Sequence, residues 1–271
     1  MSAPSKKITV GTSILLFSVV IILEQVYQLI VMYTAMPILF YHVLFLTIPV
    51  IGLIIFAIFI KLTQSSYRRQ GYKKPAGLNT SMCILLSLGF LGLYLSIVLV
   101  QSFFGNIGSF MFPTSLPSII YRIASAVLYA FYTESIFRGY IFRNLTGSYG
   151  LFIPLYISSI LFSVHQISIN DISTITTDGI FMYIFNRIIP LLAMGLFLGF
   201  FFYKIRWSLI GPLTFRIGFL FLMEPIPLIS ANSPWWIALT FEMLAFAVLI
   251  LLADSIIAEP RYRRKRYGLE A

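Results

Sequence analysis

The sequence predicts an all-α protein: a polytopic transmembrane helix bundle of about eight spans, with its N- and C-termini in the cytoplasm. Three observations lead to this prediction. Of the 271 residues, 59% are hydrophobic and only 10% are charged, against about 25% charged residues in an average soluble domain. The mean hydropathy is +0.93 over the whole chain, so a water-soluble monomer would expose apolar surface nearly everywhere. The apolar residues also fall into runs near the roughly 20 residues that a membrane-spanning helix needs.

Eight such runs follow one another along the chain. They cover residues 8–33, 37–60, 81–104, 118–142, 151–165, 180–204, 208–224 and 235–257. The fifth and the seventh run are short for a span. None of the runs alternates between apolar and polar residues, as the strands of a membrane β-barrel do. We therefore expect one transmembrane domain over residues 1–271, in which helices joined by short spacers pack antiparallel.

The basic residues indicate which side of the membrane each spacer occupies. Fifteen of the nineteen lie in the N-terminal segment, in alternate spacers and in the tail: Lys6, Lys7, Lys61, Arg68, Arg69, Lys73, Lys74, Arg143, Lys204, Arg206, Arg261, Arg263, Arg264, Lys265 and Arg266. The other spacers hold none. Because basic loops stay in the cytoplasm, both ends are placed there, with 258–271 as a basic tail. We expect this charge to contact the anionic head groups of the lipid bilayer, not nucleic acid.

The composition also excludes several kinds of site. Cys83 is the one cysteine of the chain, so an internal disulfide and a cysteine-rich zinc site are both excluded. Two histidines, His42 and His165, do not suffice for a metal site built from histidine alone. We expect no cofactor and no metal.

Ionisable residues within the predicted spans are the candidates for function, because each costs roughly 2.5–3.5 kcal/mol to insert. They are Glu24, Arg122, Glu134, Arg138, His165, Arg187, Arg216 and Glu242, with Asp254 and Glu224 near span ends. Arg187 and Glu242 lie at similar estimated depths, and we expect them to pair with each other or with other partners.

Glu134 and Arg138 are four residues apart, so they share one helix face and are expected to pair. Such a pair either fixes helix packing or belongs to a reaction centre. His165 ends the next span, as a packed residue or as a general base. At 1.5 Å per residue, Glu134, His165 and Arg216 lie roughly 16, 21 and 12 Å from the inner ends of their spans. They would meet near mid-membrane if their helices are neighbours.

Three segments of residues 118–224 carry a family pattern. They are Thr133-Glu134-Ser135-Ile136-Phe137-Arg138-Gly139, then Leu161-Phe162-Ser163-Val164-His165, and Trp207-Ser208-Leu209-Ile210-Gly211-Pro212 followed by Arg216 and Leu220. They resemble the Glu-Glu-x-x-x-Arg, Phe-x-x-x-His and His-x-x-x-Asn/Asp motifs of the CAAX prenyl protease 2 / Abi family of intramembrane proteases, the CPBP family. The resemblance implies a family-like core over 118–224. It also implies a water activated by the first motif's leading Glu and by His165, with third-motif residues stabilising the oxyanion.

The sequence departs from these motifs at three reactive positions. Thr133 replaces the leading Glu, Arg216 replaces the third-motif His and Leu220 replaces the Asn. A threonine hydroxyl is not a base near neutral pH. Arg216 can stabilise an oxyanion but cannot act as an acid or a base, and Leu220 offers no donor.

Three readings follow for the function. The first is a family member with weak or lost peptidase activity, which retains a cavity for a membrane protein or a lipidated peptide. The second is an active intramembrane endopeptidase with a rearranged dyad of Glu134 and His165, supported by Arg138, Arg216 and Thr133. The third is a transporter or channel. In each case the chain is expected to be a multi-pass protein of the cell membrane.

Overall fold

The computed structural model describes residues 6–34, 38–63, 65–75, 78–104, 115–167, 183–223 and 235–257. Over these residues all regular structure is helical, which confirms the predicted all-α bundle. The helices are α1 (Lys6–Tyr33), α2 (Ile38–Leu62), α3 (Thr80–Phe104), α4 (Leu116–Glu134), η1 (Ser135–Phe142), α5 (Arg143–Tyr149), α6 (Phe152–His165), η2 (Ile184–Ile188), α9 (Ile189–Lys204), α10 (Ile210–Met223) and α11 (Trp235–Ile256). The two η elements are π-helical.

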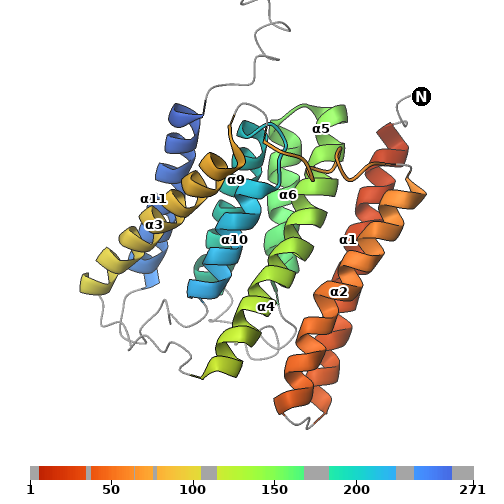
Figure 1. Ribbon diagram of the computed structural model, residues 1–271, viewed down its shortest axis with the longest axis horizontal. Helices are drawn as coiled ribbons and strands as arrows, with labels where there is room; N and C mark the ends of the chain where they lie inside the picture. The colour runs from red at the N-terminus through yellow and green to blue at the C-terminus, as the bar shows by residue number, and fades with distance from the viewer. Residues whose placement is uncertain are drawn as a thin grey trace, which may run out of the picture.

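The helices match the apolar runs of the sequence. α4, η1 and α5 follow one another without a break, so the run 118–142 forms one long helix with a π-helical middle. Among the described residues, four helices are long and apolar enough to cross a membrane: Val10–Val31, His42–Leu62, Thr80–Ile97 and Leu239–Ile256. Three apolar helices are shorter. In Figure 1 the start of α1 and the end of α11 lie at the same end of the bundle, as an even number of crossings requires. The span count and the cytoplasmic location of both termini stay predictions.

The helices stand side by side around α9 (Figure 1). α1 and α2 form a pair on one flank, α3 and α11 lie on the other, and α4, α6, α9 and α10 lie between them. On α9, the buried ring of Phe197 packs against Phe90 of α3, Phe215 of α10 and Phe246 of α11, at centroid distances of 5.7, 5.0 and 6.3 Å. The outward faces are apolar as well: Ile22, for example, is 61% exposed. Such faces suit lipid and not water.

Glycines let the central helices approach closely. A Cβ on Gly195 of α9 would lie 3.0 Å from Cβ of Ser159, and one on Gly199 would lie 2.5 Å from Cδ1 of Leu155. Both neighbours belong to α6. The Gly-x-x-x-Gly pattern therefore serves packing within this chain, in the way that small residues do in membrane bundles.

Residues 65–75 cover one end of the bundle. The amide of Leu209 donates to the carbonyl of Gly71 at 3.0 Å, and the hydroxyl of Ser208 donates to the carbonyl of Lys73 at 2.8 Å. The hydroxyls of Tyr72 and Ser135 are hydrogen-bonded to each other. The segment is thus fixed to η1 and to the turn between α9 and α10, at the end of the bundle nearest Arg138.

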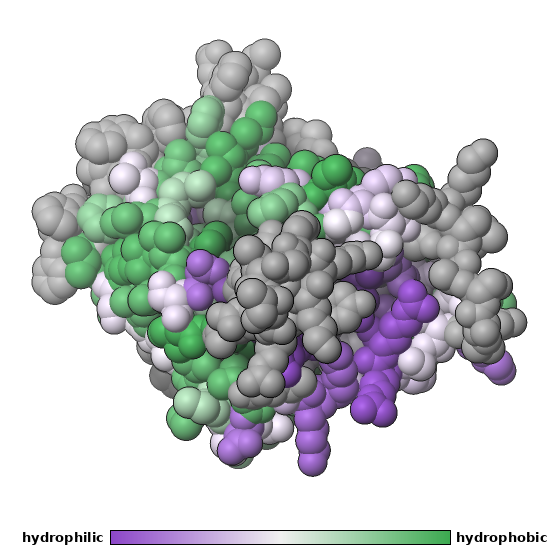
Figure 2. Space-filling model, turned by 90° about the horizontal axis from the view of Figure 1, so that it is seen from above, coloured by the Kyte–Doolittle hydropathy of each residue, from purple (hydrophilic) through white to green (hydrophobic). Residues whose placement is uncertain are grey.

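This end is also basic. Arg68, Arg69 and Lys74 are exposed here, and Figure 2, which looks onto this end, shows hydrophilic side chains gathered on one part of it. Burial lowers the pKa of the Lys73 ammonium, and the nearby charges of Arg143 and Arg68 lower it further. This concentration of like charge agrees with the side that the sequence assigns to the cytoplasm.

One expected contact is absent. No ion pair joins Arg187 to Glu242 in the described part of the chain: Arg187 is exposed in η2, whereas Glu242 is 7% exposed on α11. Similar depth along two helices was not enough to bring the side chains together, because depth says nothing about the direction in which each side chain points.

The glycine of the first motif gives a test of the packing at the basic end. A Cβ on Gly139 would lie 2.7 Å from the backbone oxygen of Gln70, and backbone cannot rotate away as a side chain does. We expect Gly139→Ala to lower the free energy of unfolding by about 1–3 kcal/mol. The control is Gly89→Ala, where nothing lies within 4 Å of the added Cβ. Thermal unfolding of the purified protein in detergent compares them, and equal midpoints for both variants would contradict this packing.

Candidate active site

Glu134 and Arg138 form the ion pair that their spacing predicts. Glu134 is the last residue of α4, and Arg138 lies one turn further on, in η1. The distance from Arg138 Nη1 to Glu134 Oε1 is 3.3 Å, and the side chains are 1% and 0% exposed, respectively. The π-helical form of η1 is itself uncommon, and such segments recur at functional sites.

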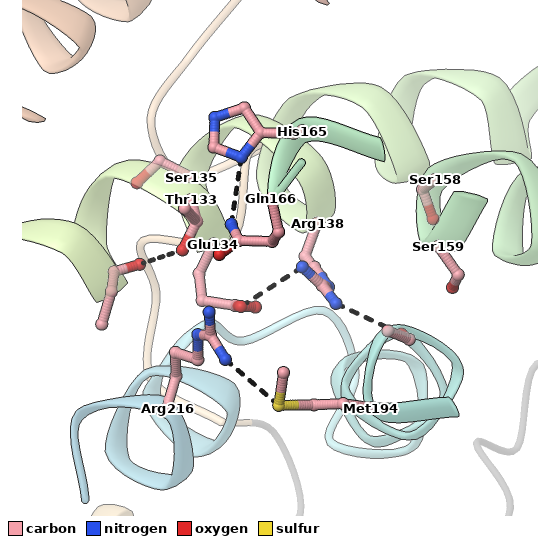
Figure 3. A network of polar contacts seen from close by, with 12 residues as sticks. Thr133, Glu134, Ser135, Arg138, Ser158, Ser159, His165, Gln166, Met194 and Arg216 are labelled. Atoms are coloured by element: carbon pink, nitrogen blue, oxygen red, sulfur yellow. Dashed lines mark hydrogen bonds and ion pairs between the residues drawn. The ribbon is translucent and has the colours of Figure 1, made fainter. Parts of the chain in front are cut away.

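Arg216 of α10 lies on the other side of the same carboxylate. Figure 3 shows the Glu134 carboxylate facing the guanidinium groups of Arg138 and Arg216, and both attract it electrostatically. The ring of Phe162 contacts both guanidinium groups, at 4.1 Å from Arg138 and 5.1 Å from Arg216. Arg138 Nη2 also donates to the carbonyl of Gly195 at 3.3 Å. We call Glu134, Arg138, Arg216 and Phe162 the arginine cluster.

Several polar atoms of the arginine cluster have no hydrogen-bond partner among the described residues. Both Glu134 oxygens are buried and accept no hydrogen bond, because the contact with Arg138 is not aligned for one. Arg216 Nη1 contacts the sulfur of Met194 at 3.1 Å, a weak acceptor, and Arg216 Nε has no acceptor. Arg138 Nη1 has no hydrogen-bond acceptor either, so the cluster offers two acceptor atoms and two donor atoms to a further group.

His165 belongs to a second cluster, and its partner comes from α1. His165 Nε2 lies 2.9 Å from Oε1 of Glu24, and these side chains are 0% and 8% exposed. The hydroxyl of Tyr132 lies 3.5 Å from the same nitrogen. On the other side of the ring, Nε2 of Gln166 lies 3.0 Å from Nδ1 (Figure 3). We call Glu24, Tyr132, His165 and Gln166 the histidine cluster.

Aromatic rings join the two clusters. The ring of Phe137 contacts His165 at 5.0 Å and Phe162 at 5.6 Å. Glu134, His165 and Arg216 thus lie in one region of the bundle, as their depths predict, but His165 contacts Glu24 and Glu134 contacts arginine. Sequence reasoning counted Glu24 only among the ionisable residues within the spans. Its rarity as a charge at bilayer depth was the one signal that singled it out.

Two of the three altered motif positions take no part in either cluster. The hydroxyl of Thr133 is buried and donates to the carbonyl of Tyr129, in its own helix, at 2.9 Å. Leu220 packs among apolar side chains at the edge of a cluster that includes Leu213. Of the substituted residues, only Arg216 reaches the polar interior.

The turn before α10 holds the remaining third-motif residues in place. Arg206 and Trp207 both have positive φ angles, 57° and 63°, which sterically cost non-glycine residues energy. The Trp207 ring offsets this cost by packing against Phe142 at 5.4 Å, with the guanidinium of Arg143 4.1 Å above it. This turn sets the direction in which α10 enters the bundle and hence the position of Arg216.

The residues present do not suggest a metal centre. Among the described residues, no three His, Cys, Asp or Glu side chains lie together as metal ligands would.

The comparisons with known proteins address the same part of the chain. The family model of the type II CAAX prenyl endopeptidase, Rce1-like, matches residues 115–222. The matched segment runs from α4 to α10 and holds both clusters apart from Glu24. No curated protein matches the chain. The central part of the chain is therefore similar to the CAAX prenyl endopeptidase family, the family that the three sequence motifs resemble.

Proposed function

We propose that the chain binds a peptide, prenylated or otherwise held in the membrane, at the arginine cluster, and that the family's hydrolysis is weak or lost. The observation that carries the proposal is the set of unsatisfied polar atoms, which are Glu134 Oε1 and Oε2, Arg138 Nη1 and Arg216 Nε. An extended peptide presents an N–H donor and a C=O acceptor at each residue. These groups complement the two acceptor atoms and the two donor atoms of the cluster, and buried polar atoms left without a hydrogen bond are costly.

The substitutions argue against full hydrolytic activity. Thr133 is directed to its own helix, and Leu220 supplies no donor. The alternative reading, a dyad of Glu134 and His165, would require the carboxylate to leave Arg138, 3.3 Å away. The separation of two buried charges in an apolar medium costs several kcal/mol. The family match favours a protease-like protein over the third reading, a transporter or channel.

Binding can be tested with a farnesylated CAAX-type peptide that carries a photo-crosslinker, applied to the full-length chain in lipid nanodiscs. Arg216→Lys keeps a positive charge beside Glu134 and removes the Nε donor. We expect this variant to reduce crosslinking about 10-fold, the effect of one lost hydrogen bond to a charged group. The matched control is Glu242→Gln, which changes a buried carboxyl outside both clusters, and its crosslinking should equal that of the parent. Equal crosslinking by all three proteins would contradict the proposal.

The arginine cluster also predicts an effect on stability. Glu134→Gln leaves two buried guanidinium groups without their counter-charge, and removal of one partner of a buried pair costs about 3–5 kcal/mol. We expect a much lower unfolding midpoint in detergent for Glu134→Gln than for Glu242→Gln, since no described ion pair includes Glu242. A midpoint for Glu134→Gln equal to that of the control would show that Glu134 does not neutralise the arginines.

A further inference from the structure

We propose that the arginine cluster binds the C-terminal carboxylate of its peptide, so that the chain holds a peptide by its free end and not by an internal peptide bond. The inference rests on the peptide binding proposed above and names the class of group that the site accepts. Its starting point is an imbalance of charge. The cluster holds two guanidinium groups and one carboxylate, and Arg138, Arg216 and Glu134 are 1%, 1% and 0% exposed.

The second guanidinium group has no counter-charge of its own among the described residues. Glu134 pairs with Arg138 at 3.3 Å. Glu134 also attracts Arg216, whereas the charge of Arg138 repels it. The other described carboxylates form no ion pair with either arginine, and they belong to Glu24, Glu242 and Asp254. The described cluster thus carries one positive charge in excess, which is costly in a buried, apolar place unless an anion joins it.

Arg216 has the donors that such an anion needs. Its Nε has no acceptor, and its Nη1 meets the sulfur of Met194 at 3.1 Å, which is a weak acceptor. Figure 3 shows this guanidinium beside the Glu134 carboxylate and the Met194 sulfur. A guanidinium group binds a carboxylate through two parallel N–H···O bonds. The N–H groups of Arg216 that lack a strong acceptor are therefore available to a carboxylate from outside the chain.

The end of a peptide carries both groups that the cluster lacks. The last residue has an N–H donor next to a carboxylate. Its N–H matches the oxygens of Glu134, which accept no hydrogen bond, and its carboxylate matches the N–H groups of Arg216. The net charge of the occupied cluster is then zero. An internal peptide bond supplies the same N–H but a neutral C=O, so it leaves the excess charge in place. The cluster therefore favours a free C-terminus over an internal segment.

The substitution in the third motif accounts for this preference. Arg216 stands where the motif has a histidine. A neutral histidine at this position would leave Glu134 and Arg138 as a balanced pair, whereas arginine stays charged in proteins. The substitution thus changes the group that fits beside Glu134 from a neutral carbonyl to an anion.

The test compares two peptides that differ only at the C-terminus. The full-length chain in nanodiscs of zwitterionic lipid is titrated with the farnesylated CAAX-type photo-crosslinking peptide, once as the free acid and once as the C-terminal amide, which has nearly the same shape and no charge. For the parent, we expect half-maximal crosslinking of the acid at a concentration about 10-fold lower or more, the effect of hydrogen bonds to a charged group. Arg216→Gln removes the excess charge and leaves the Glu134–Arg138 pair, so it should crosslink both peptides equally. The control, Glu242→Gln, should keep the preference of the parent.

Two results would overturn the inference and leave the binding proposal intact. The first is equal crosslinking of acid and amide by the parent, as expected if a small inorganic anion already balances the cluster; this comparison needs no variant to fold. The second is a preference for the acid that Arg216→Gln retains in full, which would place the carboxylate elsewhere. Arg216→Lys, which keeps the charge, should still prefer the acid, and equal crosslinking by this variant would also count against a role for the charge. If the parent crosslinks neither peptide, both proposals fail.

Discussion

Charge neutralisation within an apolar bundle is the constraint on which the polar interior of this protein depends. A charged group that leaves water for this medium requires an opposite charge nearby. Glu134 supplies one carboxylate to two guanidinium groups, and the carboxylate of Glu24 lies 2.9 Å from Nε2 of His165. These contacts join α1, α4, η1, α6 and α10 around one region, so the same interactions that hold the helices also define the site.

The need to neutralise buried charge also relates the altered motifs to one another. With Thr133 in place of a carboxylate, the first motif has one acid instead of two, and that acid neutralises Arg138. Arg216 then brings a further positive charge toward Glu134, which leaves the arginine cluster more positive than a simple pair. The second carboxylate of the region is Glu24, on a helix more than a hundred residues away in sequence from His165. A carboxylate thus still lies beside the first and the second motif. The one beside the second motif comes from Glu24, a residue that the family pattern does not include.

Sequence reasoning predicted the relations within a helix and missed those between distant helices. The apolar runs predicted the helices, and the four-residue spacing predicted the contact between Glu134 and Arg138. These rest on helical geometry, which spacing determines. The contact between Glu24 and His165 depends on how α1 lies against the end of α6, which neither periodicity nor loop charge encodes. A direct contact between Arg187 and Glu242, one of the two outcomes expected for them, is absent among the described residues for the same reason, since depth was known and direction was not.

The central claim is that a carboxylate from α1 completes the site at His165. A double-mutant cycle tests it most directly, with Glu24→Gln, His165→Gln and the double variant, and with unfolding free energies measured in lipid. The account predicts a coupling of about 1–3 kcal/mol between the two positions, as expected for residues in direct contact. The parallel cycle of Glu242→Gln with His165→Gln should be additive. Additivity between Glu24 and His165 as well, to within about 0.5 kcal/mol, would contradict the account.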